Sequence, residues 1–380
     1  MKTKQVLALF FCSLVPWTIG NGLIPLLPVY ATRLGATPTS AGNYLSLSYL
    51  AIAVGAFSAG WVSDRSGNRR LPIILTGLLS IPLTWLMGHA SSVGSLTILT
   101  ALVWLFGGLG LALISILAGL SAGRDERGKI FGLLALTGGL GAFIGGLTSG
   151  YIVDHWGFTA LFSILAVFLI LWPVSAFFLS ETKPKETEKE QEAVTERAPL
   201  GRSFHLLFSA SLISSSAGFF ILLGRSLMMS DLGFSATAIS ITGAVSGLIA
   251  MPLPLLMGWL SDRTGRKPYL YLAYLAGMIG LILLPFSTSL AAFVVVAILQ
   301  AVFTWINGSV GNALVTDILP PQAIGRGLAS FGATAWIGGI LGFAVAGYLL
   351  QHLGVLPTFV IGAFLPLIAI FLLIPVRPRT

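Results

Sequence analysis

Long apolar runs alternate with short polar breaks along the whole chain. Each run approaches or exceeds the roughly 20 apolar residues that an α-helix needs to cross the hydrocarbon core of a bilayer. The runs are too long for the strands of a membrane barrel, and they lack the alternation of lipid-facing and lumen-facing residues. The pattern therefore predicts twelve spanning helices, six on each side of one polar interval. The expected spans cover residues 6–30, 40–62, 71–89, 95–119, 129–153, 157–179, 203–229, 236–260, 269–287, 290–315, 323–350 and 355–376.

The polar interval separates two predicted six-helix bundles, residues 1–180 and 203–380. It covers residues 181–202, where glutamates mix with lysines and arginines. This composition is typical of a solvated linker. We expect a cytoplasmic tether, with a binding site for a regulatory partner as the alternative.

Lysines and arginines gather in alternate breaks between the runs, and only Arg33 and Arg225 fall on the opposite side. Because positive residues accumulate in cytoplasmic loops, both termini are predicted to be cytoplasmic and the protein to lie in the inner or plasma membrane. Lys2 and Lys4 before the first run also fit a cleaved signal peptide. That run continues to Tyr30 without a clear cleavage site, which favours a first spanning helix.

Composition agrees with a protein that has lipid as its solvent. The 380 residues are 56% hydrophobic and 9% charged, and the net charge of +8 is spread over the breaks rather than gathered in a stripe that would bind nucleic acid. Cys12 is the only cysteine, so no intrachain disulfide and no thiolate metal cluster is expected. No cofactor and no metal site is predicted.

One charged segment occurs twice. Residues 60–70 read GWVSDRSGNRR, and residues 258–268 read GWLSDRTGRKP. The same register joins Leu34-Gly35 to Leu232-Gly233 and Thr39 to Thr237, and a further pair is Arg127-Gly128 and Arg326-Gly327. Such internal repetition is expected of a duplicated transporter.

At these residues the sequence resembles the major facilitator superfamily, whose loop between the second and third helices carries G-x-x-x-D-R/K-x-G-R/K-R/K. The resemblance covers nearly the whole chain and implies twelve helices in two pseudo-symmetric six-helix bundles that rock about a central substrate site. The matching residues are Gly60, Asp64, Arg65, Gly67, Arg69 and Arg70 in the first copy, and Gly258, Asp262, Arg263, Gly265, Arg266 and Lys267 in the second.

The chemistry of this motif predicts a breakable latch on the cytoplasmic side. Gly60 and Gly258 would let a neighbouring helix approach closely. Asp64 and Asp262 would accept hydrogen bonds from a facing helix N-terminus, whose dipole favours an anion. The arginines would pair with these aspartates and with Asp125 or Glu126. The alternative is that the charges only set the topology, because an exposed ion pair contributes about 0–1 kcal/mol.

Glycines are dense in the fifth and eleventh expected spans, which predicts close helix packing. The residues concerned are Gly141, Gly145, Gly146, Gly338 and Gly342. The fifth span also resembles the antiporter motif of drug-exporting family members, G-x-x-x-G-P-x-x-G-G. Ala142 stands here in place of its proline and Thr137 in place of its first glycine.

Polar and aromatic residues inside the spans are candidate substrate contacts, because polar side chains are costly in lipid. The resemblance places spans one, four, seven and ten around the central cavity. The candidates there are Trp17, Asn21, Trp104, Gln300, Thr304 and Asn307. Hydrogen bonding between helices explains the polar members equally well.

Arg225 is the cation that these boundaries place deepest inside a span. Its long side chain would reach the membrane interface by snorkelling. The alternative is that it attracts an anionic group of the substrate.

No acidic residue falls near the middle of a span. Protons are therefore only a candidate coupling ion, with Asp154 and Asp317 at span ends as weak candidates for carrying them. A cationic drug would lack a counter-charge, whereas neutral or amphipathic molecules suit an aromatic, weakly polar cavity.

These patterns together predict a monomeric secondary transporter that exports small amphipathic or drug-like molecules by alternating access, and thus a role in multidrug resistance. The alternatives are a facilitator or importer of a neutral or anionic metabolite and, from another class, a lipid scramblase or flippase. An enzyme is not expected, since no catalytic constellation lies in the spans. A nucleotide-driven pump is disfavoured because the chain has no G-x-x-x-x-G-K-S/T loop.

Overall fold

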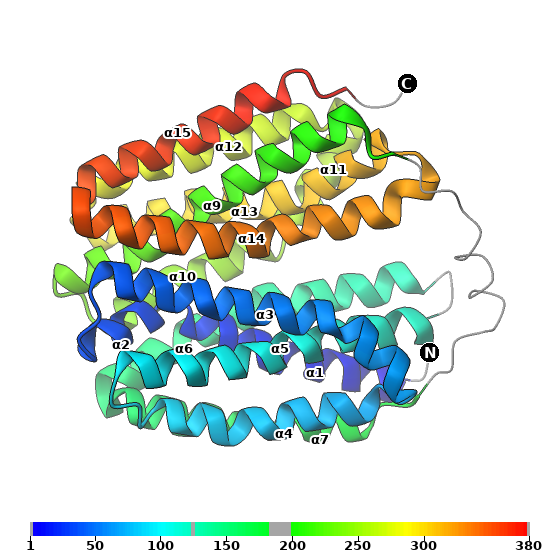
Figure 1. Cartoon of the computed structure of the whole chain (residues 1–380), viewed down its shortest axis with the longest axis horizontal. Helices are drawn as coiled ribbons and strands as arrows, with labels where there is room; N and C mark the ends of the chain where they lie inside the picture. Colours follow the sequence, from blue (N-terminus) through cyan, green and yellow to red (C-terminus); the bar gives the residue numbers. More distant parts are fainter. Residues whose placement is uncertain (1–2, 123–125, 182–198, 378–380) are drawn as a thin grey trace. The chain divides into compact units, whose positions relative to one another are not determined.

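The computed structural model describes residues 3–122, 126–181 and 199–377, and every regular element in these ranges is a helix. Figure 1 shows the helices in chain order. The helices before the linker are α1 (Thr3–Leu23), α2 (Leu27–Arg33), α3 (Pro38–Ser66), α4 (Arg70–Met87), α5 (Val93–Ser121), α6 (Arg127–Leu169) and α7 (Leu171–Phe177). Those after it are α9 (Gly201–Asp231), α10 (Ala236–Ala250), α11 (Leu253–Thr264), α12 (Lys267–Leu283), η1 (Leu284–Phe286), α13 (Leu290–Ile318), α14 (Pro321–Leu353) and α15 (Val355–Leu373).

The helices follow the predicted spans, several of which are broken locally. Ten of the described helices are long and apolar enough to cross a membrane, and α10 with α11, bent by 40°, makes eleven. The longest run, 128–177, contains Gly157 at φ 78°, a left-handed conformation that interrupts the helix where two expected spans meet. The predicted fold class, an all-α membrane protein, is confirmed.

The described chain packs as two compact units. Unit 1 consists of the described parts of residues 1–36, 47–184 and 233–248, and unit 2 of those of residues 37–46, 185–232 and 249–380. Each unit thus holds most of one predicted bundle and the first part of the second helix of the other repeat. The predicted bundles were contiguous; the exchange arises because the first part of α3 packs on α14 and that of α10 packs on α6.

Within each unit, pairs of long helices lie side by side. In unit 1, α1 packs along α6, and α4 packs along α5 and α7. In unit 2, α9 lies between α14 and α15, and α12 lies along both α13 and α15 (Figure 1).

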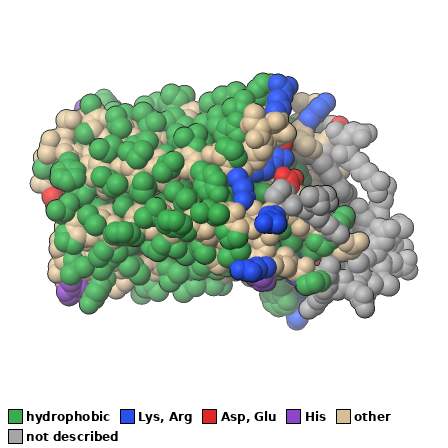
Figure 2. All heavy atoms as spheres, turned by 90° about the horizontal axis from the view of Figure 1, so that it is seen from above, with side chains coloured by type: hydrophobic (Ala, Val, Ile, Leu, Met, Phe, Trp, Pro, Cys, Tyr) green, Lys and Arg blue, Asp and Glu red, His purple; other side chains and the backbone are tan. Residues whose placement is uncertain are grey.

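The outward-facing side chains are those of a protein that lies in lipid. Phe57, Val167 and Phe371 are each more than 60% exposed, at 67%, 67% and 61%. Figure 2 shows a face covered along its length by hydrophobic side chains, with lysines and arginines gathered toward one end. This is the distribution expected of a membrane-spanning body with a polar cap.

Candidate functional site

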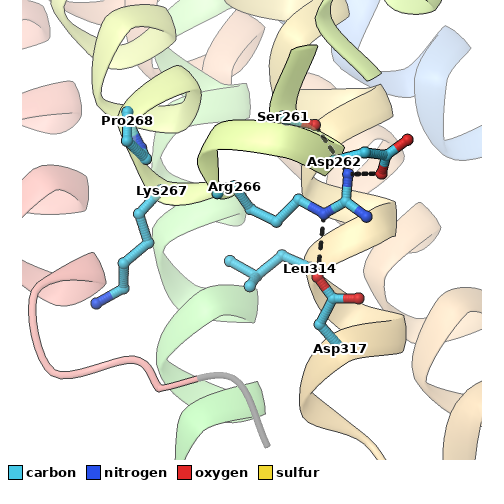
Figure 3. Close-up of a pocket in the computed structure, with 8 residues that line it drawn as sticks. Ser261, Asp262, Arg266, Lys267, Pro268, Leu314 and Asp317 are labelled. Carbon is cyan, nitrogen blue, oxygen red and sulfur yellow. Dashed lines mark hydrogen bonds and ion pairs between the residues drawn. The ribbon is translucent and has the colours of Figure 1, made fainter. Parts of the chain in front are cut away.

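The second copy of the repeated motif forms a charged cluster at the turn between α11 and α12 in unit 2. Gly265 takes a φ of 93° at this turn, a conformation that glycine adopts without a steric penalty. The turn brings Arg266 between two acids (Figure 3): it pairs with Asp262 of α11, and its Nε donates to Asp317 of α13 at 3.0 Å. Its Nη1 also donates to the hydroxyl of Ser261 at 2.9 Å. One guanidinium thus ties α11 to α13.

A cavity of about 420 Å³ lies beside this cluster. Figure 3 shows Arg266 extending past Leu314 toward the two acids, whereas Lys267 points away from them. Lys267 instead donates through Nζ to the carbonyl of Ile374 at 2.8 Å. Arg266 therefore binds the two acids, whereas Lys267 binds a backbone carbonyl.

Arg266 keeps its positive charge because its acidic neighbours raise its pKa. Burial by itself would lower the pKa of this guanidinium, but the hydrogen bonds and the charges of Asp317 and Asp262 outweigh it and raise the pKa above its ordinary value. Arg266 is therefore a permanent cation, and any loosening of the cluster must begin at the acids.

The first copy, in unit 1, has a related arrangement with a different acid. Arg69 is only 6% exposed, and its Nε donates to the hydroxyl of Ser63 at 2.8 Å. Its Nη1 lies 3.9 Å from Glu181, whose other oxygen accepts from the backbone N–H of Arg70 at 2.5 Å. Gly67, at φ 61°, makes the turn. The guanidinium of Arg70 stacks over Phe177, 4.8 Å from the ring centroid.

Two contacts recur in both copies, and sequence analysis gave neither a role. A serine–arginine hydrogen bond joins Ser63 to Arg69 and Ser261 to Arg266. An arginine also lies over a tryptophan one turn earlier, at 5.6 Å for Arg65 over Trp61 and at 3.8 Å for Arg263 over Trp259. The sequence signal for both contacts is that Trp and Ser occupy the same positions in the two copies of the motif.

The partner that the motif predicts for Asp64 is not among the described residues. Asp64 is exposed and has no hydrogen bond or ion pair with any described residue. Nothing described lies within 4 Å of a Cβ placed on Gly60 or Gly258. The close approach of a helix to these two glycines stays a prediction. Asp125 lies outside the described residues. Among the described acids, Glu181 lies near Arg69, and Asp262 and Asp317 contact Arg266.

The substrate candidates of unit 1 lie on α1 and α5. Trp17 is half-buried, and Asn21 donates to the carbonyl of Gly138 on α6 at 3.0 Å. Trp104 is buried and meets Tyr49 edge to face, with ring centroids 5.3 Å apart. Asn21 thus has the interhelical bond that was the alternative to substrate contact.

The candidates of unit 2 separate into two groups. Arg225 donates to Gln300 at 2.8 Å, and these two side chains form one group. Asn307 belongs to a second, buried network, in which it donates to Ser211 at 3.1 Å and accepts from Tyr274 at 3.1 Å. Thr304, between them on α13, is exposed.

The five packing glycines lie against neighbouring helices. Gly141 and Gly145 meet Thr18 and Gly22 of α1, and Gly146 meets Ala244 of α10. Gly338 and Gly342 meet Ser215 and Ser216 of α9. A Cβ at any of the five would overlap a neighbouring residue.

A pair of polar contacts, unforeseen from the sequence, fixes the first turns of α3 and α10. In unit 1, the carboxylate of Asp154 on α6 accepts from the backbone of Ala236 at 2.9 Å, and from the backbone and hydroxyl of Thr237 at 2.8 and 2.5 Å. In unit 2, Gln351 of α14 accepts from the backbone of Thr39 at 3.2 Å. Thr39 and Thr237 are the matched threonines of the repeat, so the two contacts are counterparts.

Comparison with known proteins places this architecture in a family. The Major Facilitator Superfamily model matches residues 6–224 and 206–380, which is nearly the whole chain. The chain belongs to this superfamily.

Relatives within the superfamily differ in what they carry. The chain is 30% identical over 281 residues to the multidrug resistance protein MdtG of Salmonella arizonae (strain ATCC BAA-731 / CDC346-86 / RSK2980), which covers 70% of this chain and 68% of MdtG. The fold matches the nucleoside transporter NupG with a TM-score of 0.80 at 15% identity, over 100% of both chains. It matches a D-xylose-proton symporter with a TM-score of 0.77 at 15% identity, over 99% and 98% of the two chains.

Membership of the superfamily confirms the general predictions. The chain is a multi-pass membrane protein and a secondary transporter of small molecules, and it is not an enzyme.

Proposed function

We propose that the chain exports small amphipathic or drug-like molecules across the inner membrane by alternating access, with both termini cytoplasmic and the protein acting as a monomer. The name of MdtG supports export and drug-like cargo. The acids of the described helices lie near helix ends, at Asp64, Asp231, Asp262 and Asp317, or near the break at Gly157, at Asp154, so a cationic drug would lack a central counter-charge.

The proposal of alternating access is supported by a difference between the contacts at the two ends of the helices. At the predicted outer side, Asp154 and Gln351 each hold the first turn of a helix from the other repeat. At the predicted cytoplasmic side, Asp64 has no partner in the described part of the chain, and the space beside Gly60 and Gly258 is open. We infer that Asp64 gains its partner in another conformation, since alternating access requires more than one.

The direct test is transport into everted membrane vesicles from cells that express the full chain. We expect a neutral fluorescent amphipathic dye to accumulate when a proton gradient is imposed, and a protonophore to abolish the accumulation if protons are coupled. Asp64→Asn should slow the initial rate by about tenfold, which corresponds to 1.4 kcal/mol in activation free energy. Asp231→Asn, which changes another exposed acid without a described hydrogen-bond partner, is the matched control and should transport normally.

Other outcomes would favour the alternatives. Counterflow that needs no gradient would favour a facilitator or importer of a metabolite. Equilibration of a labelled phospholipid between leaflets, without dye transport, would favour a scramblase.

A further inference from the structure

Arg225 of α9 is a buried cation near the predicted outer side of unit 2. Its side chain is 2% exposed, so it does not reach the membrane surface by snorkelling, which was the first interpretation of the sequence. It lies six residues before the end of α9 at Asp231. The partial negative charge at a helix C-terminus falls off within the last turn, so this dipole does not balance the guanidinium.

The contacts of Arg225 leave most of its hydrogen-bonding capacity unused. Its Nη1 donates to Oε1 of Gln300 at 2.8 Å, which is its one hydrogen bond with a described residue, and its Nε is buried without a partner. The Nε2 of Gln300 donates to the carbonyl of Gly218 at 2.9 Å, which fixes the amide with its oxygen toward the guanidinium. No acid in the described ranges forms an ion pair with Arg225.

A guanidinium has five N–H donors in a planar fork that matches the two oxygens of a carboxylate or sulfonate. A neutral amide supplies only one of the required acceptors and no opposite charge. A buried ion is costly unless it is paired, so the unused donors of Arg225 would stabilise an anion bound beside them.

We propose that Arg225, oriented by Gln300, binds the anionic group of an amphipathic organic acid carried by the transporter. This assignment rests on the proposed function and adds to its neutral cargo a class of molecules that join an apolar body to a carboxylate or sulfonate. Thr304 is exposed one helical turn beyond Gln300, and its hydroxyl lies 3.8 Å from a Cβ placed on Gly218. On α13, Thr304 is the exposed polar residue nearest in sequence to Gln300.

Binding to the purified full-length protein tests the proposal with three probes of one shape: naphthalene-2-sulfonate, its neutral sulfonamide, and the corresponding naphthylmethylammonium cation. Hydrogen bonds to a charged group predict that wild type binds the sulfonate about 10–100-fold more tightly than the sulfonamide. Arg225→Gln should abolish this preference and Arg225→Lys should keep part of it. Arg33→Gln, which removes a cation that stacks over Phe158 in unit 1, is the matched control and should keep all of it.

A second variant covers the case in which Arg225→Gln does not fold. Gln300→Glu places a carboxylate at the guanidinium, so it should raise the melting temperature and abolish the preference for the sulfonate. Unchanged sulfonate affinity in Gln300→Glu, or equal affinity of wild type for the sulfonate and the sulfonamide, would overturn the proposal. Neutral dye transport in vesicles is the separate readout: a wild type that binds the sulfonate but moves no dye contradicts the export function and leaves the anion site standing.

Discussion

The repeated motif uses the same serine–arginine bond in its two copies but combines it with different acids. Arg266 has two carboxylates, Asp262 and Asp317, whereas Arg69 has one at 3.9 Å. Asp64 has no hydrogen bond or ion pair with a described residue, whereas its counterpart Asp262 pairs with Arg266 of its own loop. The two copies therefore differ in how readily their aspartate can engage a new partner.

This difference predicts unequal and non-additive effects of acid removal around Arg266. Asp262→Asn and Asp317→Asn should each cost at most about 1 kcal/mol of stability, because one carboxylate remains and the site is partly exposed. The double variant leaves the guanidinium, 17% exposed, without an acid, and should exceed the sum of the single effects by about 0.5 kcal/mol or more. Thermal unfolding of the purified variants measures the cycle.

The control is Asp64→Asn, which removes an acid without a described partner and should leave the melting temperature unchanged while it slows transport. Simple additivity of the Asp262 and Asp317 effects would show that Arg266 does not couple the two acids.

At the scale of whole helices, small residues determine where α6 and α10 touch. Gly146, Gly150 and Asp154 recur every fourth residue on α6, and they meet Ala244, Ser240 and Ala236 on α10. The hydroxyl of Ser240 donates to the carbonyl of Gly146 and accepts from the backbone of Gly150. Close backbone approach of this kind requires residues without bulk.

Gly146→Ala should therefore weaken the contact between α6 and α10. A Cβ there would overlap the backbone of Ala244, and overpacking of this kind costs about 1–3 kcal/mol, or roughly tenfold or more in the population of the separated state. The measurement is the rate at which a polar maleimide modifies Ser240→Cys, a position with 0% exposure, in a Cys12→Ser background. Gly132→Ala on the same helix has no described neighbour within 4 Å and should not change this rate. A similar increase in both variants would mean that helix flexibility, not the contact, is responsible.

The helices themselves could be predicted from the sequence, because an apolar run in lipid has few ways to satisfy its backbone other than a helix. The contacts of Asp154 could not, because its partners at 236 and 237 follow it by more than 80 residues and no local pattern links them. The repeat matches Thr39 to Thr237, but it does not indicate that the backbone N–H of each donates to a side chain of a neighbouring helix. The sequence also does not show which helix would approach Gly60 and Gly258, because a missing side chain permits a contact but does not require one.

For the whole molecule, the charge pattern predicts which loops face the cytoplasm. Ser91, between α4 and α5, and Ser66, at the end of α3, are both exposed and are predicted to face opposite sides. In the Cys12→Ser background, a membrane-impermeant thiol reagent should label Ser91→Cys in intact cells and Ser66→Cys only after permeabilisation. The unaltered chain is the control, because Cys12 is 0% exposed and should not react. The reverse labelling pattern would invert the predicted orientation.

The exchange of segments between the units has a consequence for biosynthesis. Unit 1 needs residues 233–248, which leave the ribosome only after the linker and α9 have been made. Domains usually fold in the order of their synthesis, N-terminal first. The glycine-bearing face of α6 therefore has no α10 to pack against until α10 has been synthesised. Unit 1 is completed only while unit 2 is already being translated.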